Sequence, residues 1–138
     1  MKYFLDTNVI SHLIRKDEKA IEKIKEITKD GDYELYINRL VYMESLRAIP
    51  LKREPLYEKT KDLLDSLSKV DIKQETYSKG VAFARFCKSK GLNFGKCEAI
   101  DYLHFMTAKY YDLEIISFDG DMKKLEEKYL EFLESLNV

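Results

Sequence analysis

The chain has 138 residues, 45% of them hydrophobic, and a formal net charge of −1. This length favours one domain with a sizeable core, which we expect to span residues 1–138. The near balance of charge argues against a protein that coats nucleic acid through overall positive charge. No apolar run approaches the ~20 residues of a membrane span, and we see no signal peptide. We therefore expect a cytoplasmic protein, with its two cysteines, Cys87 and Cys97, reduced.

Short apolar runs alternate with amphipathic segments in the first half of the chain. The pattern predicts a strand at 2–5, helices at about 8–14 and 17–31, a strand at 33–37, and helices from Arg39 to before Pro50 and from Pro55 to about Leu67. Asp17 and Glu18 suit the positive start of the second helix, Gly31 suits its end, and Asn38 can cap the third.

The second half continues the alternation. It predicts a brief strand at 70–72, helices at 74–90 and 97–111 around a loop at 91–96, a strand at 113–118 and a helix at 121–128, with the tail at 129–138 ambiguous between helix and strand. Alternating strands and helices indicate an α/β fold, with a mainly parallel sheet of about four to five strands flanked by helices.

Two carboxylates directly follow predicted strands. Asp6 comes after KYFL, and Asp119 comes after LEIISF. Open α/β sheets bind ligands outside the carboxyl ends of their strands. If these two strands are neighbours, both carboxylates lie in one crevice. Asp6 also begins the polar run Asp6-Thr7-Asn8, which is equally typical of a helix cap.

Three further acids lie in or near predicted helices. Glu44 shares a helical face with Leu40, Val41 and Ala48, and is either part of a site or paired with Arg47 at the surface.

Asp101 and Glu98 lie near the start of the helix at 97–111, where acids also complement the helix dipole. Because Asp101 is further into a largely apolar helix, the dipole explains it less well than it explains Glu98.

Several carboxylates gathered at strand ends and helix starts repel one another, and a divalent cation removes that repulsion. Mg²⁺ and Mn²⁺ prefer oxygen ligands, so a few carboxylates suffice to hold them. Such a metal lowers the pKa of bound water and stabilises the charge that develops on a phosphate. The pattern therefore favours hydrolysis of phosphodiesters without a serine or histidine nucleophile.

The segments FLDTNVIS, INRLVYMESLRAI and AIDYLHFMTAKYYDLEIISFDGDM occur in that order along the chain. Together they resemble the PIN-domain ribonucleases, and within that family the VapC-type toxins of toxin–antitoxin pairs. The resemblance covers nearly the whole chain and implies a single PIN-like domain with RNA as substrate.

The same resemblance implies residue roles. It implies an Mg²⁺ or Mn²⁺ site of four catalytic acids, Asp6, Glu44, Asp101 and Asp119. Thr7 and Asn8 would orient Asp6 and the metal-bound water, with Ser117, Asp121 and Glu98 as auxiliary groups. Arg39 and Arg47 are the best candidates for contacts with RNA. It further implies a small antitoxin partner and a homodimer.

Three other interpretations remain to be weighed. FDGD is similar to the Asp-x-Asp of aspartate-nucleophile phosphatases, but Lys123 stands where that motif usually has Thr or Val, and only 19 residues follow. A housekeeping RNA-processing nuclease of the same family is a second alternative. The third is a non-catalytic PIN-like module that binds RNA or protein, which the presence of all four acids disfavours.

Overall fold

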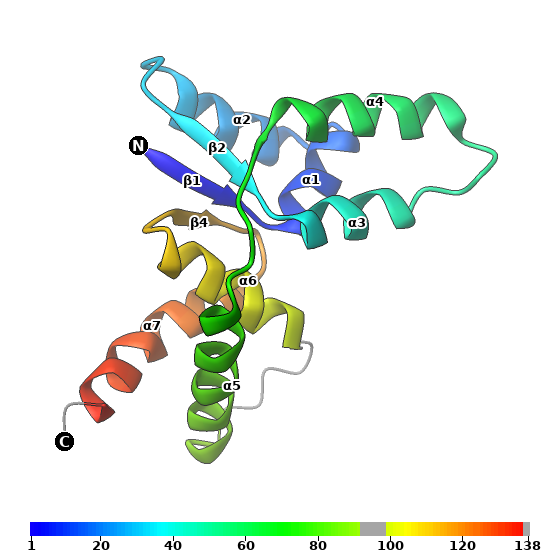
Figure 1. Cartoon of the computed structure of the whole chain (residues 1–138). Helices are drawn as coiled ribbons and strands as arrows, with labels where there is room; N and C mark the ends of the chain where they lie inside the picture. Colours follow the sequence, from blue (N-terminus) through cyan, green and yellow to red (C-terminus); the bar gives the residue numbers. More distant parts are fainter. Residues whose placement is uncertain (92–98, 137–138) are drawn as a thin grey trace. The chain divides into compact units, whose positions relative to one another are not determined.

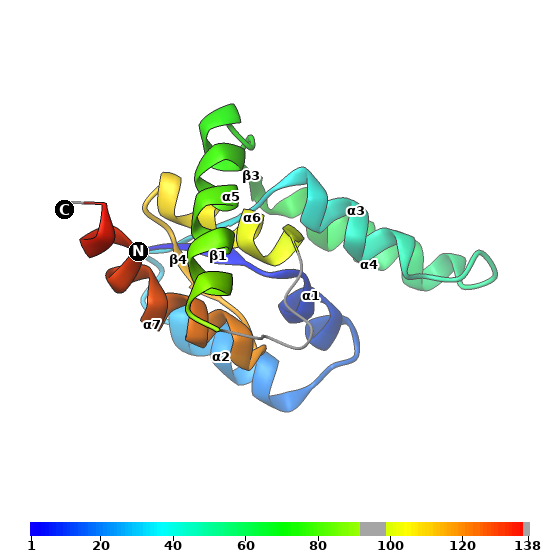
Figure 2. The ribbon, with the colours of Figure 1, turned by 90° about the horizontal axis from the view of Figure 1, so that it is seen from below.

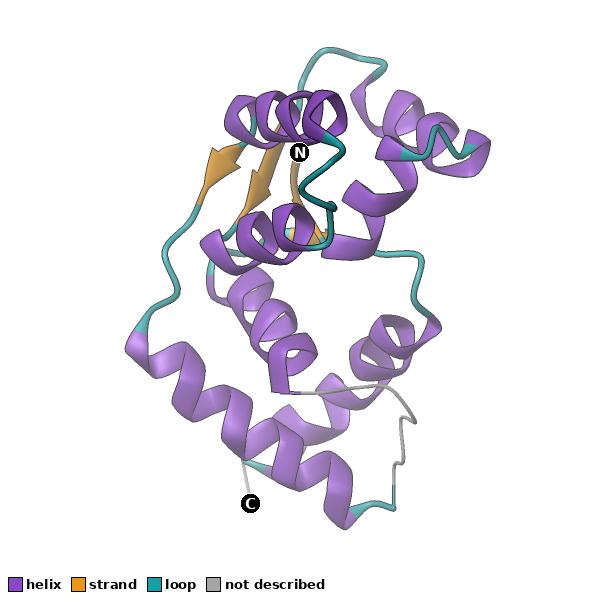
Figure 3. Ribbon diagram, turned by 90° about the vertical axis from the view of Figure 1, so that its right-hand side faces the viewer, coloured by secondary structure: helices purple, strands orange, loops and turns teal. Residues whose placement is uncertain are grey.

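The strands in the described part of the chain form one sheet, in which every neighbouring pair is parallel. A computed structural model of the protein describes residues 1–91 and 99–136 (Figure 1). Its strands are β1 (Lys2–Leu5), β2 (Glu34–Ile37), β3 (Ser68–Lys69) and β4 (Glu114–Ile116), in the order β3-β2-β1-β4 (Figure 3). Parallel pairing and the alternation of strands with helices confirm the predicted α/β fold.

The chain forms two compact units, which are described separately. The first contains residues 1–71 and 113–118, and therefore the whole sheet. The second contains residues 72–112 and 119–138 and, in its described part, is helical. The single-domain organisation expected from the chain length stays a prediction.

The first unit surrounds a buried central strand. Tyr3, Phe4 and Leu5 of β1 are all buried, as expected for a strand of a parallel sheet covered on both faces. Its helices are α1 (Thr7–Ile14), α2 (Glu18–Thr28), α3 (Arg39–Arg47) and α4 (Glu54–Ser66). Helices α3 and α4 lie side by side (Figure 2).

Side chains at the N-termini of these helices cap them, as the sequence predicts. Asp17 Oδ1 accepts a hydrogen bond from the Ala20 N–H at 3.2 Å, and Asn38 Oδ1 accepts from the Val41 N–H at 2.9 Å. Pro55 lies in the first turn of α4, where its missing N–H costs nothing. The predicted helices at 8–14 and 17–31 and the two that follow are therefore confirmed, with bounds that shift by a few residues.

Aromatic rings pack together in the core of the second unit. Its described helices are α5 (Gln74–Ser89), α6 (Ala99–Tyr110) and α7 (Gly120–Ser135). The fully buried rings of Phe83 and Phe105 stack with centroids 5.4 Å apart, and Phe132 lies 5.1 Å from Phe83. Tyr129 packs edge-on against both Phe83 and Phe105. Such pairs add ~0.5–1.5 kcal/mol each beyond the area that they bury.

This aromatic packing decides the ambiguous tail. Leu125, Tyr129 and Phe132 are spaced four and three residues apart, so one helical face carries all three to the same core. Residues 129–135 are therefore helical and continue the predicted helix at 121–128.

Two strand predictions need correction. The strand predicted at 70–72 is wrong, because β3 is Ser68–Lys69 and residues 70–72 are not in a strand. The prediction followed the apolar residues at 70–72, of which Val70 is buried, but the strand partner of Ile37 is Lys69, one residue before Val70. The strand predicted at 113–118 is shorter, because β4 ends at Ile116. The loop at 91–96 lies almost entirely outside the described residues, as does Cys97.

No helix in the described ranges is long and apolar enough to cross a membrane. Cys87 is buried. The reduced state expected for the two cysteines stays a prediction.

The turn between α1 and α2 contains a residue with strained backbone. Lys16 has φ = 58°, in the left-handed region that glycine adopts without a steric penalty. Its N–H donates to the Leu13 carbonyl and the Asp17 N–H donates to the His12 carbonyl, each at 3.0 Å. This is the Schellman pattern of a helix end, in which glycine is the usual residue.

We expect Lys16→Gly to raise the free energy of unfolding by about 0.5–1 kcal/mol, because it removes the Cβ strain at an exposed position. Lys29→Gly is the matched control. Lys29 is also exposed at a helix end but has φ = −58°, so glycine there should lower stability by about as much. Urea denaturation of both variants measures the difference, and a loss of stability in both would contradict the argument.

Candidate active site

Asp6 lies where the buried strand β1 ends and α1 begins. Its neighbour β4 runs parallel to β1, with Leu5 opposite Ile116. The Asp6 N–H donates to the Ile116 carbonyl at 3.1 Å, so the two chains are still paired where the polar residues start. Asp6 and Ser117 therefore follow the carboxyl ends of adjacent strands. The strands that precede Asp6 and Asp119 are therefore neighbours in the sheet.

Hydrogen bonds from three residues surround the Asp6 carboxylate. Asp6 Oδ1 accepts from the Thr7 N–H at 2.8 Å, and Oδ2 accepts from the Ser117 hydroxyl at 3.0 Å and from Asn8 Nδ2 at 3.4 Å. Asp6 itself is only 5% exposed. A carboxylate buried to this degree requires such donors, because an uncompensated charge in the interior is costly.

Asn8 joins the end of β4 to the start of α1. Its Nδ2 donates to Ser117 Oγ at 2.9 Å, and its Oδ1 accepts from the Phe118 N–H at 3.0 Å. The nitrogen and the oxygen of the Asn8 side-chain amide thus bond to two consecutive residues, Ser117 and Phe118. This contact explains why β4 is shorter than predicted, since the Phe118 N–H bonds to a side chain and not to a strand.

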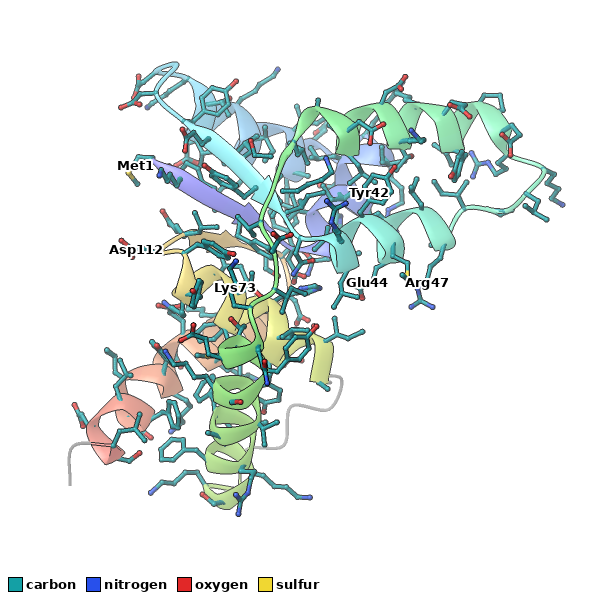
Figure 4. The ribbon with its side chains drawn as sticks, viewed as in Figure 1. Met1, Tyr42, Glu44, Arg47, Lys73 and Asp112 are labelled. Atoms are coloured by element: carbon teal, nitrogen blue, oxygen red, sulfur yellow. The ribbon has the colours of Figure 1, made fainter. Side chains whose placement is uncertain are left out.

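Thr7 connects Asp6 to Glu44 of α3. While the Thr7 N–H donates to Asp6, its hydroxyl donates to Glu44 Oε1 at 2.8 Å. Figure 4 shows Glu44 and Arg47 on the side of α3 away from α4, and Tyr42 between these helices. Glu44 is half-buried, whereas Arg39 and Arg47 are exposed. One threonine thus holds two carboxylates, one from a strand end and one from a helix.

The structure brings together five of the predicted residues in the first unit. Thr7, Asn8, Glu44 and Ser117 form a continuous set of hydrogen bonds with Asp6. The Thr7–Glu44 bond was not predicted, and nothing in the local sequence signals it, because 37 residues separate the partners.

The other predicted acids belong to the second unit. Asp101 lies in the first turn of α6. Asp119 is the N-cap of α7, where its Oδ1 accepts from the Asp121 N–H at 2.9 Å. Asp121 lies 3.9 Å from Lys124 Nζ, and Glu98 is outside the described residues. Within residues 1–91 and 99–136, no group of three or more acidic, histidine or cysteine side chains is arranged as a metal site.

Comparisons with known proteins support the fold. A family model described as PIN domain matches residues 3–128. A VapBC2 structure from Rickettsia felis, bound to a DNA fragment from their promoter, has a TM-score of 0.75 at 18% identity, covering 91% of this chain and 93% of that chain. FitAcB from Neisseria gonorrhoeae has a TM-score of 0.71 at 18% identity, with the same coverages.

A toxin–antitoxin complex from Klebsiella pneumoniae has a TM-score of 0.65 at 20% identity, covering 85% of this chain and 86% of that chain. At these identities the likeness shows the fold alone. No curated protein matches the chain.

The hydrogen bonds of Ser117 generate a stability prediction. Ser117→Ala removes a donor to Asp6 and the acceptor of Asn8, so it should lower the free energy of unfolding by about 1–2 kcal/mol. Ser66→Ala is the control, because the Ser66 hydroxyl is exposed and bonds only locally to the Leu63 carbonyl. Urea denaturation should show a clearly larger loss for Ser117→Ala, and equal effects would exclude the network as a stabilising feature.

Proposed function

The chain belongs to the PIN-domain family, and on that premise we propose that it is a metal-dependent endoribonuclease and the toxin of a VapBC-type toxin–antitoxin pair. The observation that carries the proposal is the hydrogen-bonded set around Asp6, in which Thr7 holds the carboxylates of both Asp6 and Glu44. Two like charges held through one residue favour a cation between or beside them.

The residues present fit Mg²⁺ or Mn²⁺. Asp6 and Glu44 offer carboxylate oxygens, the ligands that these hard cations prefer, and Asp6 is oriented by fixed donors. We assign the metal and the catalysis to Asp6, Glu44, Asp101 and Asp119. When bound, the ion would activate water and stabilise charge on the phosphate.

The protein's own residues prepare this chemistry. Ser117 and Asn8 fix the rotamer of Asp6, and the Thr7 hydroxyl fixes one oxygen of Glu44. Such supporting bonds commonly set metal affinity, because they hold a ligand in its binding orientation. Asp121 and Glu98 are assigned auxiliary roles. The exposed Arg39 and Arg47 on α3 are the proposed contacts to RNA phosphates.

A small antitoxin is the proposed partner, and a homodimer is the proposed assembly. The similar structure from Klebsiella pneumoniae is named as a toxin–antitoxin complex, which supports the first of these. The alternatives are a housekeeping RNA-processing nuclease of the same family and a PIN-like module that binds without cleaving.

We expect Asp6→Asn, Glu44→Gln, Asp101→Asn and Asp119→Asn each to lower RNA cleavage by about a hundredfold or more, because each removes a proposed metal ligand. Cleavage of mixed RNAs with Mg²⁺, Mn²⁺ or chelator measures this. Asp65→Asn is the control, since that carboxylate pairs with Lys61 on α4 and is not assigned to the site. Unchanged cleavage in a double variant, Asp6→Asn with Asp119→Asn, would indicate a contaminant or another site.

Thermal melts provide a check on Asp119 that does not need activity. Asn can replace Asp as an N-cap, so Asp119→Asn should leave the metal-free protein about as stable as the parent. Mn²⁺ should stabilise the parent through mass action and the variant much less. Equal shifts in both proteins would remove Asp119 from the proposed site.

Growth of the host distinguishes a toxin from a housekeeping nuclease. Expression of the protein in its own host, stripped of any neighbouring antitoxin gene, should slow growth, and the Asp6→Asn variant should not. Colony counts and growth curves measure the effect. If the active protein is harmless under these conditions, the housekeeping alternative becomes the better conclusion.

A further inference from the structure

A surface hollow of about 650 Å³ in the first unit adjoins the hydrogen bonds of Asp6. It is lined by His12, Asp17, Glu18, Lys19 and Phe118. None of these residues has been given a role in the proposed site. The hollow combines the partly exposed Phe118 with charged lining residues.

The backbone of Phe118 takes part in the same set of hydrogen bonds as Asp6. Its N–H donates to Asn8 Oδ1 at 3.0 Å, and the preceding residue, Ser117, donates to Asp6. The residue as a whole nevertheless remains 39% exposed. Its backbone is therefore held near Asp6, while the residue stays accessible to a ligand.

The imidazole ring of His12 packs against the ring of Phe118. The two rings meet edge to face, with centroids 5.3 Å apart and planes at 81°. His12 Nδ1 in turn lies 3.5 Å from Asp17 Oδ2, and the Asp17 N–H donates to the His12 carbonyl at 3.0 Å. A perpendicular contact of this kind covers at most one face of the Phe118 ring, so His12 does not cover the other face.

The charges of the hollow select the kind of ligand. The Ala20 amide that bonds to Asp17 is the main cause that holds the pKa of Asp17 below its ordinary value, so this carboxylate stays charged. Asp17 and Glu18 outnumber the single lysine of the lining, Lys19, so the hollow disfavours a phosphate. A flat, neutral aromatic group suits this hollow better. Its face can stack on Phe118, and the polar groups at its edge can bond to the charged side chains of the lining.

We infer that an unpaired nucleobase of the RNA stacks on the ring of Phe118 in this hollow. The inference rests on the proposed function, and it assigns a base-contacting role to Phe118. A base in a duplex is already stacked and paired, and must leave the helix before its face can reach Phe118.

The experiment measures stacking and affinity without cleavage. A short single-stranded RNA carries 2-aminopurine at one position, moved along the strand in a series, and each version is also tested in a duplex. Binding is followed in chelator by fluorescence polarisation, and stacking by quenching of 2-aminopurine. The variants are Phe118→Leu, Phe118→Trp and the control Tyr33→Leu, since Tyr33 is a similarly exposed aromatic of the same unit, 41% exposed, that does not line the hollow.

We expect one position to be quenched by the parent, and Phe118→Leu to lose that quenching and weaken binding about fivefold or more. Phe118→Trp and Tyr33→Leu should behave as the parent. The inference is overturned if no position is quenched by the parent, if Phe118→Leu matches Tyr33→Leu, or if duplex RNA binds as tightly as the single strand.

A separate assay with Mn²⁺ keeps the two proposals distinguishable. Phe118-dependent binding and quenching without cleavage would support the base-stacking site and reject the nuclease. Cleavage that is indifferent to Phe118→Leu would support the nuclease and reject the stacking site. Thermal melts of each variant confirm that it is folded.

Discussion

The buried carboxylate of Asp6 is the constraint on which the arrangement of the first unit depends. A charge with 5% exposure is tolerated only if hydrogen bonds replace the water that it has lost. Here the donors come from the start of α1 and the segment after β4, and Thr7 extends the set to α3. Satisfying this one group therefore fixes how two strand ends and two helices meet.

An acid follows each of two adjacent strands of the parallel sheet, β1 and β4. Strands that run in the same direction deliver their carboxyl ends together, and each is followed by a helix whose first N–H groups need acceptors. Asp6 caps α1 and Asp119 caps α7. The capping and functional interpretations of these residues are thus compatible, because a carboxylate has two oxygens and several acceptor positions.

The proposed chemistry and the proposed stacking site use neighbouring residues for different purposes. Ser117 and Asn8 serve the carboxylate, whereas Phe118 presents a ring on the same short segment. Affinity for unpaired bases would compensate for the lack of a strongly positive surface in a chain with a net charge of −1. Recognition by stacking, and not by bulk charge, is consistent with this composition.

The sequence by itself determined the elements and the acidic candidates. Periodicity, caps and Gly31 located most helices and strands, because those signals act over a few residues. The prediction of a strand at 70–72 was wrong because apolar residues indicate burial but do not indicate which residue pairs with Ile37. The sequence also left the tail ambiguous between helix and strand, and its helical conformation follows from the packing of Phe132 and Tyr129 against Phe83. Only the tertiary structure decided that Thr7 bonds to Glu44 and that His12 contacts Phe118, since contacts between residues far apart in the chain leave no local pattern.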